Sequence, residues 1–221
     1  MSTPSFKQDL LQQFARVGKA LSNANRLEML EFLGQGECDV ETLSGKCGLS
    51  IANTSQHLQQ LRHAGLVRSR KEGLRVYYSL TGLEVITLLH SLQQVAENNL
   101  AEVDMLVSKY LTTKDDLEPI EARELLRLAK DGNVTVLDVR PSDEYEAGHI
   151  SGALNVPLSE LEKHLKDLPK DKEVVAYCRG PYCVLAYEAV EQLRKKGYKV
   201  RRLEEGYPEW VSSGLPVSIR Q

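Results

Sequence analysis

The stretch Val174-Val-Ala-Tyr-Cys178-Arg-Gly-Pro-Tyr-Cys183-Val-Leu-Ala-Tyr-Glu-Ala-Val-Glu-Gln-Leu193 combines a short apolar run, a loop that begins at Cys178, and apolar residues at helical spacing. This pattern predicts a buried strand followed by a tight loop and a helix. Ligands of open α/β sheets bind at the carboxyl edge of the strands, where a helix N-terminus offers unpaired N–H groups. Such donors lower the pKa of a cysteine thiol. We therefore expect a reactive site made of Cys178, Arg179, Gly180, Tyr182 and Cys183.

The two cysteines of this loop leave alternatives open. A free cysteine is commonly a small buried hydrophobic residue, but Arg179 and Gly180 beside Cys178 at a strand-to-helix turn favour a reactive thiol. Cys183 could come within disulfide reach of Cys178, resolve a persulfide on it, or pack beneath the helix.

The 221 residues are enough for two domains of ordinary size. The four cysteines form two pairs far apart in the sequence, unlike the disulfide framework of a secreted protein. The N-terminus has no signal-peptide pattern, and no apolar run approaches the length of a membrane span. We expect a cytoplasmic protein without membrane contact.

The first half of the chain predicts a winged helix-turn-helix. Two helices are expected near residues 6–21 and 25–33, and two more about a glycine-bearing turn at residues 45–50. Residues 66–80 read as a two-stranded hairpin. The helix over 51–63 is expected to bury Ile51, Leu58 and Leu61 and to leave its polar side chains free.

Polar helix faces are usually only solvated, but the local charge here favours DNA. The net charge is −3, yet residues 62–75 carry five basic residues against one acid. Amides, hydroxyls and guanidinium groups are what base edges and phosphates require. The candidate DNA-binding residues are Asn53, Ser55, Gln56, His57, Gln59, Gln60, Arg62, Arg68, Arg70, Lys71 and Arg75.

Apolar residues spaced by threes and fours from Leu83 to Leu111 predict one long helix. A seam of this length favours a homodimer through the first and last helices of residues 1–111, although it could instead cover its own domain or the second one. A dimer suits DNA because two recognition helices then meet successive major grooves.

Residues 1 to about 111 resemble the ArsR-type winged helix regulators in Leu21-Ser-Asn-Ala-Asn-Arg-Leu-Glu-Met-Leu, in Ser55-Gln-His-Leu-Gln-Gln-Leu-Arg-His-Ala-Gly-Leu-Val and in Gly73-Leu-Arg-Val-Tyr-Tyr-Ser-Leu. The resemblance implies a dimeric repressor that releases operator DNA when an inducer arrives. Many relatives sense metals through two cysteines separated by one residue. Here Cys38 is followed by Val40 in the second position, which counts against a metal site.

Residues 112–119 are polar, end in proline and read as a linker. Strands and helices then alternate over residues 120–221, which predicts a mostly parallel sheet with helices on both faces. This half resembles a single rhodanese domain in Val136-Leu-Asp138-Val-Arg140, in Glu144 to Pro157, in the Cys178 loop and in Leu203 to Trp210. The resemblance implies that Cys178 carries a sulfane sulfur as a persulfide. Asp138, Arg140 and His149 are expected to be buried scaffold.

The sequence thus predicts a mainly α winged helix-turn-helix domain joined to an α/β rhodanese-like domain. We expect a homodimeric regulator that binds operator DNA and senses or transfers sulfur from a small donor such as thiosulfate or a persulfide, with no cofactor and no metal. Two alternatives stay open. One is a sulfurtransferase enzyme placed by its winged helix, and the other is a metal-responsive repressor whose rhodanese domain is idle.

Overall fold

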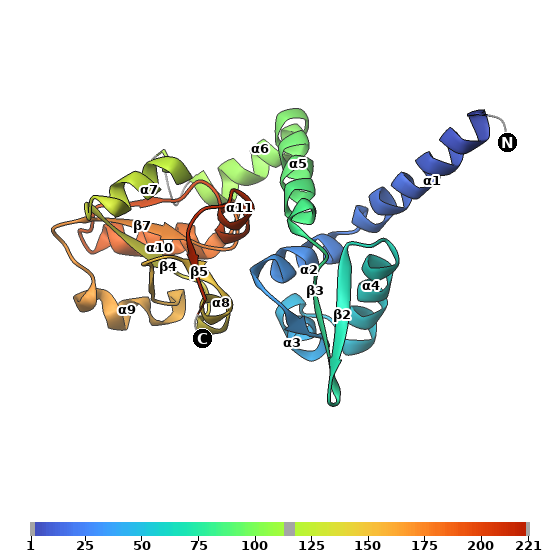
Figure 1. Ribbon diagram of the computed structural model, residues 1–221. Coiled ribbons are helices and arrows are strands. Elements are labelled where there is room, and N and C mark those ends of the chain that lie inside the picture. The colour runs from blue at the N-terminus through green and yellow to red at the C-terminus, as the bar shows by residue number, and fades with distance from the viewer. Residues whose placement is uncertain (1–2, 113–117, 220–221) are drawn as a thin grey trace. The chain divides into compact units, whose positions relative to one another are not determined.

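The computed structural model describes residues 3–112 and 118–219 of the chain (Figure 1). The chain divides into two compact units, and the division lies between Val85 and Ile86. Of the expected linker, residues 113–117 lie outside the described residues. The expected domain limits, 1–111 and 120–221, stay a prediction.

The first unit is a winged helix-turn-helix. Its helices are α1 (Thr3–Leu21), α2 (Ala24–Gln35), α3 (Val40–Cys47) and α4 (Ile51–His63). Side chains cap the helices where the sequence allows: Asn23 accepts from the N–H of Arg26, Asp39 caps α3, and Ser50 caps α4. Gly48 ends α3 in the left-handed region at φ 63°, which lets the chain turn at once into α4.

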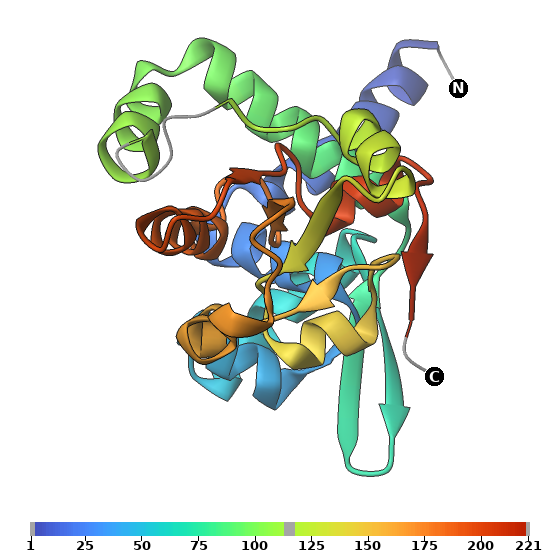
Figure 2. The ribbon, with the colours of Figure 1, turned by 90° about the vertical axis from the view of Figure 1, so that its left-hand side faces the viewer.

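The wing is an antiparallel hairpin of β2 (Val67–Glu72) and β3 (Arg75–Leu80), which projects from the unit in Figure 2. The short strand β1 (Cys38–Asp39) pairs with the other side of β3. Gly73 and Leu74 make the two-residue turn at its tip, and Gly73 takes the positive φ of 58° that such a turn needs. Met29, Leu30, Leu43, Leu58 and Leu61 are fully buried beneath the hairpin and helices.

Two expectations for the first half are wrong. Ile51 is 55% exposed, because the first residue of α4 precedes the turn that packs against α3. The expected single helix from Leu83 to Leu111 is two helices, α5 (Leu83–Asn99) and α6 (Ala101–Val107), followed by a short π-helix at Ser108–Thr112. The backbone of Leu100 is extended between them, where Asn99 donates its side-chain N–H to the carbonyl of Val95.

The second unit contains a four-stranded parallel sheet in the order β6-β4-β7-β8. These strands are β4 (Val134–Asp138), β6 (Leu154–Asn155), β7 (Glu173–Tyr177) and β8 (Val200–Arg202). A two-stranded antiparallel pair, β5 (His149–Ile150) and β9 (Val217–Ser218), lies apart from it. The parallel order confirms the α/β class expected from the alternating pattern.

Helices cover both faces of this sheet. On one face, α9 (Leu161–His164) and α10 (Val184–Lys195) pack on a cluster that includes Val174, Ala176 and Cys178. On the other, α7 (Ala122–Lys130) and α11 (Tyr207–Ser212) pack on a cluster that includes Val175, Tyr177 and Trp210. Successive residues of β7 therefore point to opposite cores, and the strand is buried on both sides. A further short helix, α8 (Ser142–Ala147), precedes β5.

Candidate functional site

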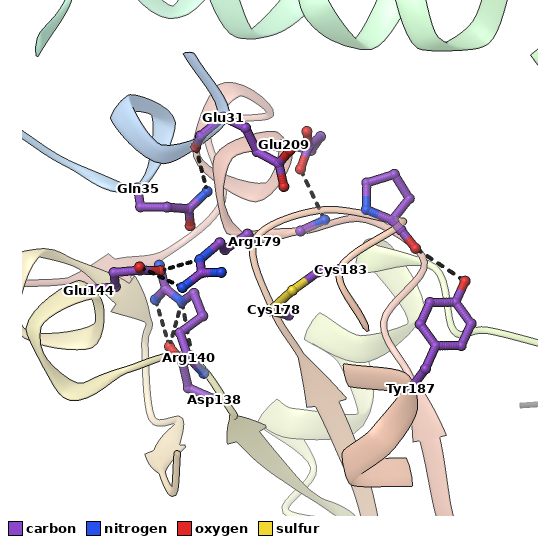
Figure 3. Close-up of a disulfide and its surroundings, with 12 residues drawn as sticks. Glu31, Gln35, Asp138, Arg140, Glu144, Cys178, Arg179, Cys183, Tyr187 and Glu209 are labelled. Atoms are coloured by element: carbon purple, nitrogen blue, oxygen red, sulfur yellow. Dashed lines mark hydrogen bonds and ion pairs between the residues drawn. A yellow bond between two sulfur atoms is a disulfide. The ribbon is translucent and has the colours of Figure 1, made fainter. Parts of the chain in front are cut away.

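The candidate site is the loop between β7 and α10, which begins at Cys178 as expected. Because β7 lies between β4 and β8, the loop leaves from an inner strand of the sheet at its carboxyl edge. Cys178 and Cys183 are joined by a disulfide with their Cα atoms 6.1 Å apart (Figure 3). Cys178 is 2% exposed and Cys183 is 9% exposed. Cys183 is thus within bonding reach of Cys178 and is also packed under the start of α10.

Hydrogen bonds shape this loop tightly. The N–H of Cys183 donates to the carbonyl of Gly180 over 3.1 Å, which closes a turn inside the loop. The Tyr187 hydroxyl on α10 donates to the carbonyl of Pro181, also over 3.1 Å. Tyr182 is half-buried in the same turn. The backbone N–H of Cys183 is therefore already bonded to an acceptor within the loop. The expectation that unpaired N–H groups surround the Cys178 sulfur stays a prediction.

The start of α11 packs directly against the Cys178 loop. The N–H of Tyr207 donates to the carbonyl of Cys178 over 3.0 Å. A Cβ at Gly206 would lie far inside van der Waals contact with the carbonyl group of Arg179 and the Cα of Gly180. Glu209 accepts from the N–H of Gly206, and burial raises the pKa of its carboxyl group, which hydrogen bonds only partly offset. Position 206 therefore requires glycine because the loop passes so close to it.

Arg179 is held by a buried carboxylate on α8. Its Nε and one terminal nitrogen donate to the two carboxylate oxygens of Glu144, each over 2.9 Å (Figure 3). Glu144 is 3% exposed on its side chain and Arg179 is 18% exposed. This two-point geometry fixes the direction of the guanidinium. The residue after Cys178 thus ties the loop to α8.

A second buried ion pair lies at the end of β4. Arg140 Nη2 is 2.6 Å from Asp138 Oδ2, and both side chains are fully buried. The Tyr177 hydroxyl donates to Asp138 over 2.5 Å and accepts from the N–H of Ile150. Burial lowers the pKa of Arg140, but the ion pair with Asp138 outweighs it and the net direction is upward. Burial also raises the pKa of Tyr177, so its hydroxyl stays protonated and donates.

This network confirms the scaffold role expected for its members. Arg140 also donates to the carbonyl of Gly148 over 2.8 Å and stacks 4.3 Å from the centre of the Tyr207 ring. His149 is 8% exposed, stacks on Tyr145 at 3.7 Å and hydrogen bonds to its carbonyl oxygen. Asp138, Arg140 and Tyr177 connect elements inside the core, whereas His149 and Tyr145 also line an open pocket of about 590 Å³. They join β4, α8, β5 and α11 around the loop.

The candidate DNA-binding residues lie on α4 and the wing of the first unit. Exposed side chains belong to Asn53, Gln56, Gln59, Gln60, Arg62, Arg68, Arg70, Lys71 and Arg75, whereas Ser55 and His57 are half-buried. Burial lowers the pKa of His57, and the nearby Arg26 lowers it further, so its imidazole is neutral at pH 7.

Several of these groups already have partners. Arg70 forms ion pairs with Glu37 and Glu72, and Arg75 lies 3.7 Å from Asp39. Arg62 donates to Gln59 over 2.8 Å. The wing is consequently less positive than its basic residues alone suggest, because three acids lie against it.

The other two cysteines lie in the first unit and are not bonded to each other. Burial raises the pKa of Cys47 to about 12, and the charges of Glu28 and Cys38 add to the effect. Among the described residues, no group of three or more His, Cys, Asp or Glu side chains is arranged to hold a metal ion.

Sequence reasoning missed Glu144, Gly206 and Arg26. Glu144 lies 35 residues from Arg179, and Gly206 touches a loop that ends more than 20 residues before it, so no periodicity connects them. Arg26 is 8% exposed and donates to Gln60 on α4 over 2.7 Å. The sequence carries no signal for this contact, because α2 has only a weak amphipathic pattern.

Comparison with known proteins agrees with this architecture. Residues 23–69 match the family model of bacterial regulatory proteins of the arsR family, and residues 121–213 match the rhodanese-like domain. The chain is 46% identical to the HTH-type transcriptional regulator Rv0324 of Mycobacterium tuberculosis over 96% of its own length and 92% of that protein. The chain belongs to the ArsR family of transcriptional regulators. This ArsR-family regulator carries a rhodanese domain in its C-terminal half.

Other relatives match one half of the regulator. A sulfurtransferase of Allochromatium vinosum is 35% identical over 41% of this chain and 84% of its own length. The solution structure of a homodimeric winged helix-turn-helix domain from Mycobacterium bovis is 43% identical and covers 45% of this chain and 91% of its own, with a TM-score of 0.42. In the part of the regulator that the structure describes, no helix has the length and apolar character needed to cross a bilayer.

Proposed function

We propose that this regulator is a homodimer that binds operator DNA in the cytoplasm as a repressor. The exposed polar face of α4 beside the hairpin of β2 and β3 supports DNA binding, because a helix with exposed amides and a guanidinium fits a major groove. Apolar side chains support the dimer. On α1, Phe6 is 67% exposed and Phe14 is 61% exposed, and Val95 on α5 is 62% exposed. A second copy that covers these helices removes that apolar surface from water.

The finer proposal is that the Cys178 loop senses reactive sulfur. The observation that carries it is the reach of Cys183 to Cys178 inside one short loop at the sheet edge. The Cys178 thiolate attacks the sulfane sulfur of thiosulfate, the sulfur–sulfur bond of the donor breaks, and sulfite leaves with the bonding pair. Cys178 then carries a persulfide.

Cys183 completes the reaction. Its thiolate attacks Sγ of the Cys178 persulfide, hydrosulfide leaves, and the disulfide of Figure 3 remains. The two cysteines lose two electrons, which the sulfane sulfur gains as it becomes hydrosulfide. Of the two thiol protons, one ends on hydrosulfide and the other passes to water. A polysulfide serves as the donor in the same way, with a shorter polysulfide leaving in place of sulfite.

The Cys178 loop contacts two other helices of the rhodanese domain, α8 and α11. Cys178 is hydrogen bonded to α11 through Tyr207, and Arg179 is ion-paired to α8 through Glu144. Closing or opening the disulfide therefore biases the positions of two helices in the rhodanese domain. We propose that this bias shifts the dimer between a DNA-bound form and a released form, which requires the loop to interact differently with the two.

Intact-protein mass spectrometry tests the chemistry. The reduced protein, treated with thiosulfate or polysulfide, is expected to lose two hydrogen atoms as the disulfide forms, and the Cys183→Ser variant is expected to retain one extra sulfur on Cys178. The Cys178→Ser variant is expected to show neither change. A sulfur adduct on Cys38 or Cys47 with none on Cys178 would reject the proposal.

A sulfurtransferase enzyme is the second candidate, supported by the rhodanese domain and by the likeness to the sulfurtransferase of Allochromatium vinosum. The two candidates differ in the fate of the persulfide. An enzyme passes the sulfur to an external thiol or to cyanide and regenerates Cys178, whereas the sensor ends in the disulfide. Steady turnover of thiosulfate with no change in DNA binding would favour the enzyme.

A further inference from the structure

The first unit contains a pocket that is lined by basic groups and belongs to neither the wing nor the sulfur site. It is an open pocket of about 470 Å³ between the end of α1, the start of α2 and the end of α4. Four of its side chains can carry positive charge, and Ser22 and Gln60 add a hydroxyl and an amide; the charged ones are Arg16, Lys19, Arg26 and His63. No Asp or Glu is among its lining residues in the described part of the chain.

Arg26 is the buried member of this pocket, at 8% exposure. Its Nε donates to the carbonyl of Ala20 over 2.5 Å, and one terminal nitrogen donates to the carbonyl of Lys19 over 3.0 Å. The other terminal nitrogen donates to Gln60 Oε1 over 2.7 Å. All three acceptors are neutral, so these hydrogen bonds fix the orientation of the guanidinium without neutralising its charge. On each terminal nitrogen, one N–H group is not used by these bonds.

Among the described residues, the hydrogen bonds of the neighbouring Arg16 also go to neutral acceptors. Arg16 donates to the carbonyl of His63 over 2.6 Å and to Gln13 over 2.8 Å, which are again neutral acceptors. Lys19 is exposed at the rim. A guanidinium with no acid beside it in a partly buried site attracts anions strongly, because solvent screens the charge less there.

We propose that this basic pocket binds a tetrahedral oxyanion of the phosphate class. The forked N–H groups of arginine match the paired oxygens of such an anion, and Lys19 supplies a further charge. The anion is either a phosphate of the DNA backbone or a free oxyanion in solution. The proposal is independent of the sulfur chemistry, and only its DNA form rests on operator binding.

The pocket is connected to the recognition helix. Gln60, a candidate base-reading residue, has its side-chain oxygen held by Arg26, and His63 ends the same helix. An anion on Arg26 therefore acts next to the Gln60 amide. On the opposite side of α4, Arg62 reaches toward Ser69 of β2. Cations thus flank α4 on both sides, which is the arrangement that two phosphate strands beside a groove require.

Two measurements on the full-length reduced protein test the proposal. The first is calorimetric titration with inorganic phosphate at constant ionic strength. The second is the dependence of operator affinity on salt concentration. The variants are Lys19→Gln and Arg16→Gln, both at exposed positions, and the matched control is Lys7→Gln, an exposed lysine of the same helix outside the pocket.

If the ligand is a free oxyanion, phosphate binds saturably and Lys19→Gln weakens it about tenfold while Lys7→Gln does not. If the ligand is the DNA backbone, phosphate does not saturate, and each pocket variant lowers the slope of log affinity against log salt by about 0.9 for each phosphate that it no longer neutralises, with Lys7→Gln unchanged. If both pocket variants behave like Lys7→Gln in both measurements, the proposal is wrong.

Discussion

Replacing Gly206 by alanine tests whether the close approach of α11 holds the Cys178 loop in place. The new Cβ would need about 1 Å more room, since ordinary contact begins at 3.4 Å and three backbone atoms of Arg179 and Gly180 lie inside that limit. Backbone cannot rotate away as a side chain does, so the loop or α11 must move. Such overpacking costs about 1 to 3 kcal/mol, and loss of the hydrogen bond from Tyr207 to Cys178 adds about 1 kcal/mol. We expect Gly206→Ala to lower the free energy of unfolding by about 2 to 4 kcal/mol.

Trp210 makes this measurement specific to the rhodanese domain. It is the one tryptophan of the sequence, is 1% exposed, and lies on α11 itself. Urea unfolding followed by its fluorescence reports the loss of that core, and the matched control is Gly180→Ala, whose Cβ meets nothing within 4 Å. The control is expected to change stability by less than about 0.5 kcal/mol. Equal stability of the two variants would refute the argument that α11 and the loop are tightly packed.

Groups with buried charges or shifted pKa values give three further predictions. Asp138→Asn removes the partner of the fully buried Arg140 and should cost about 3 to 5 kcal/mol by the same fluorescence signal, whereas Asp167→Asn, at a carboxylate 71% exposed, should cost less than about 1 kcal/mol. Equal losses would contradict the buried ion pair. Cys47, with a pKa of about 12, should react with iodoacetamide at pH 8 more than about a hundredfold slower than free cysteine, as followed by peptide mass spectrometry. Reaction at the free rate would show that the thiol is not buried. For Asp39, burial raises the pKa, but hydrogen bonds from Thr42 and Glu41 outweigh it and the net direction is downward. The stability that its ionised form adds is therefore complete above the unfolded pKa of about 4 and is lost as pH falls through the folded value. Asp39→Ala should cost about 1 kcal/mol at pH 7 by thermal unfolding, and a cost that does not shrink below pH 4 would contradict the cap.

The sequence predicted the elements that have long, regular patterns. The apolar run from Val174 to Tyr177 lies in β7, and the helical spacing that begins at Val184 is α10. The helix of Ala122–Lys130 is one of the helices in the alternating pattern expected over residues 120–221. These segments are determined by local burial periodicity, which is readable without knowledge of the partners.

Other features depend on partners far away in the chain. Strands β5, β6 and β9 have two residues each, which is too short for any alternation to be detected. The break at Leu100 interrupts an apolar seam that continues in phase on both sides, so the pattern alone predicted one helix. The Glu144 to Arg179 ion pair joins α8 to the site loop across 35 residues, and only the fold brings them together.

Operator affinity in defined sulfur states tests the central claim, that the Cys178 loop controls DNA binding. The same preparation is measured reduced, after treatment with polysulfide, and after reduction again, with Cys178→Ser and Cys183→Ser in parallel. We expect polysulfide to weaken binding by wild type by about tenfold or more, a coupling of about 1.4 kcal/mol, with recovery on reduction and no response in Cys178→Ser. Identical affinity of wild type in all three states would contradict control of DNA binding by this loop.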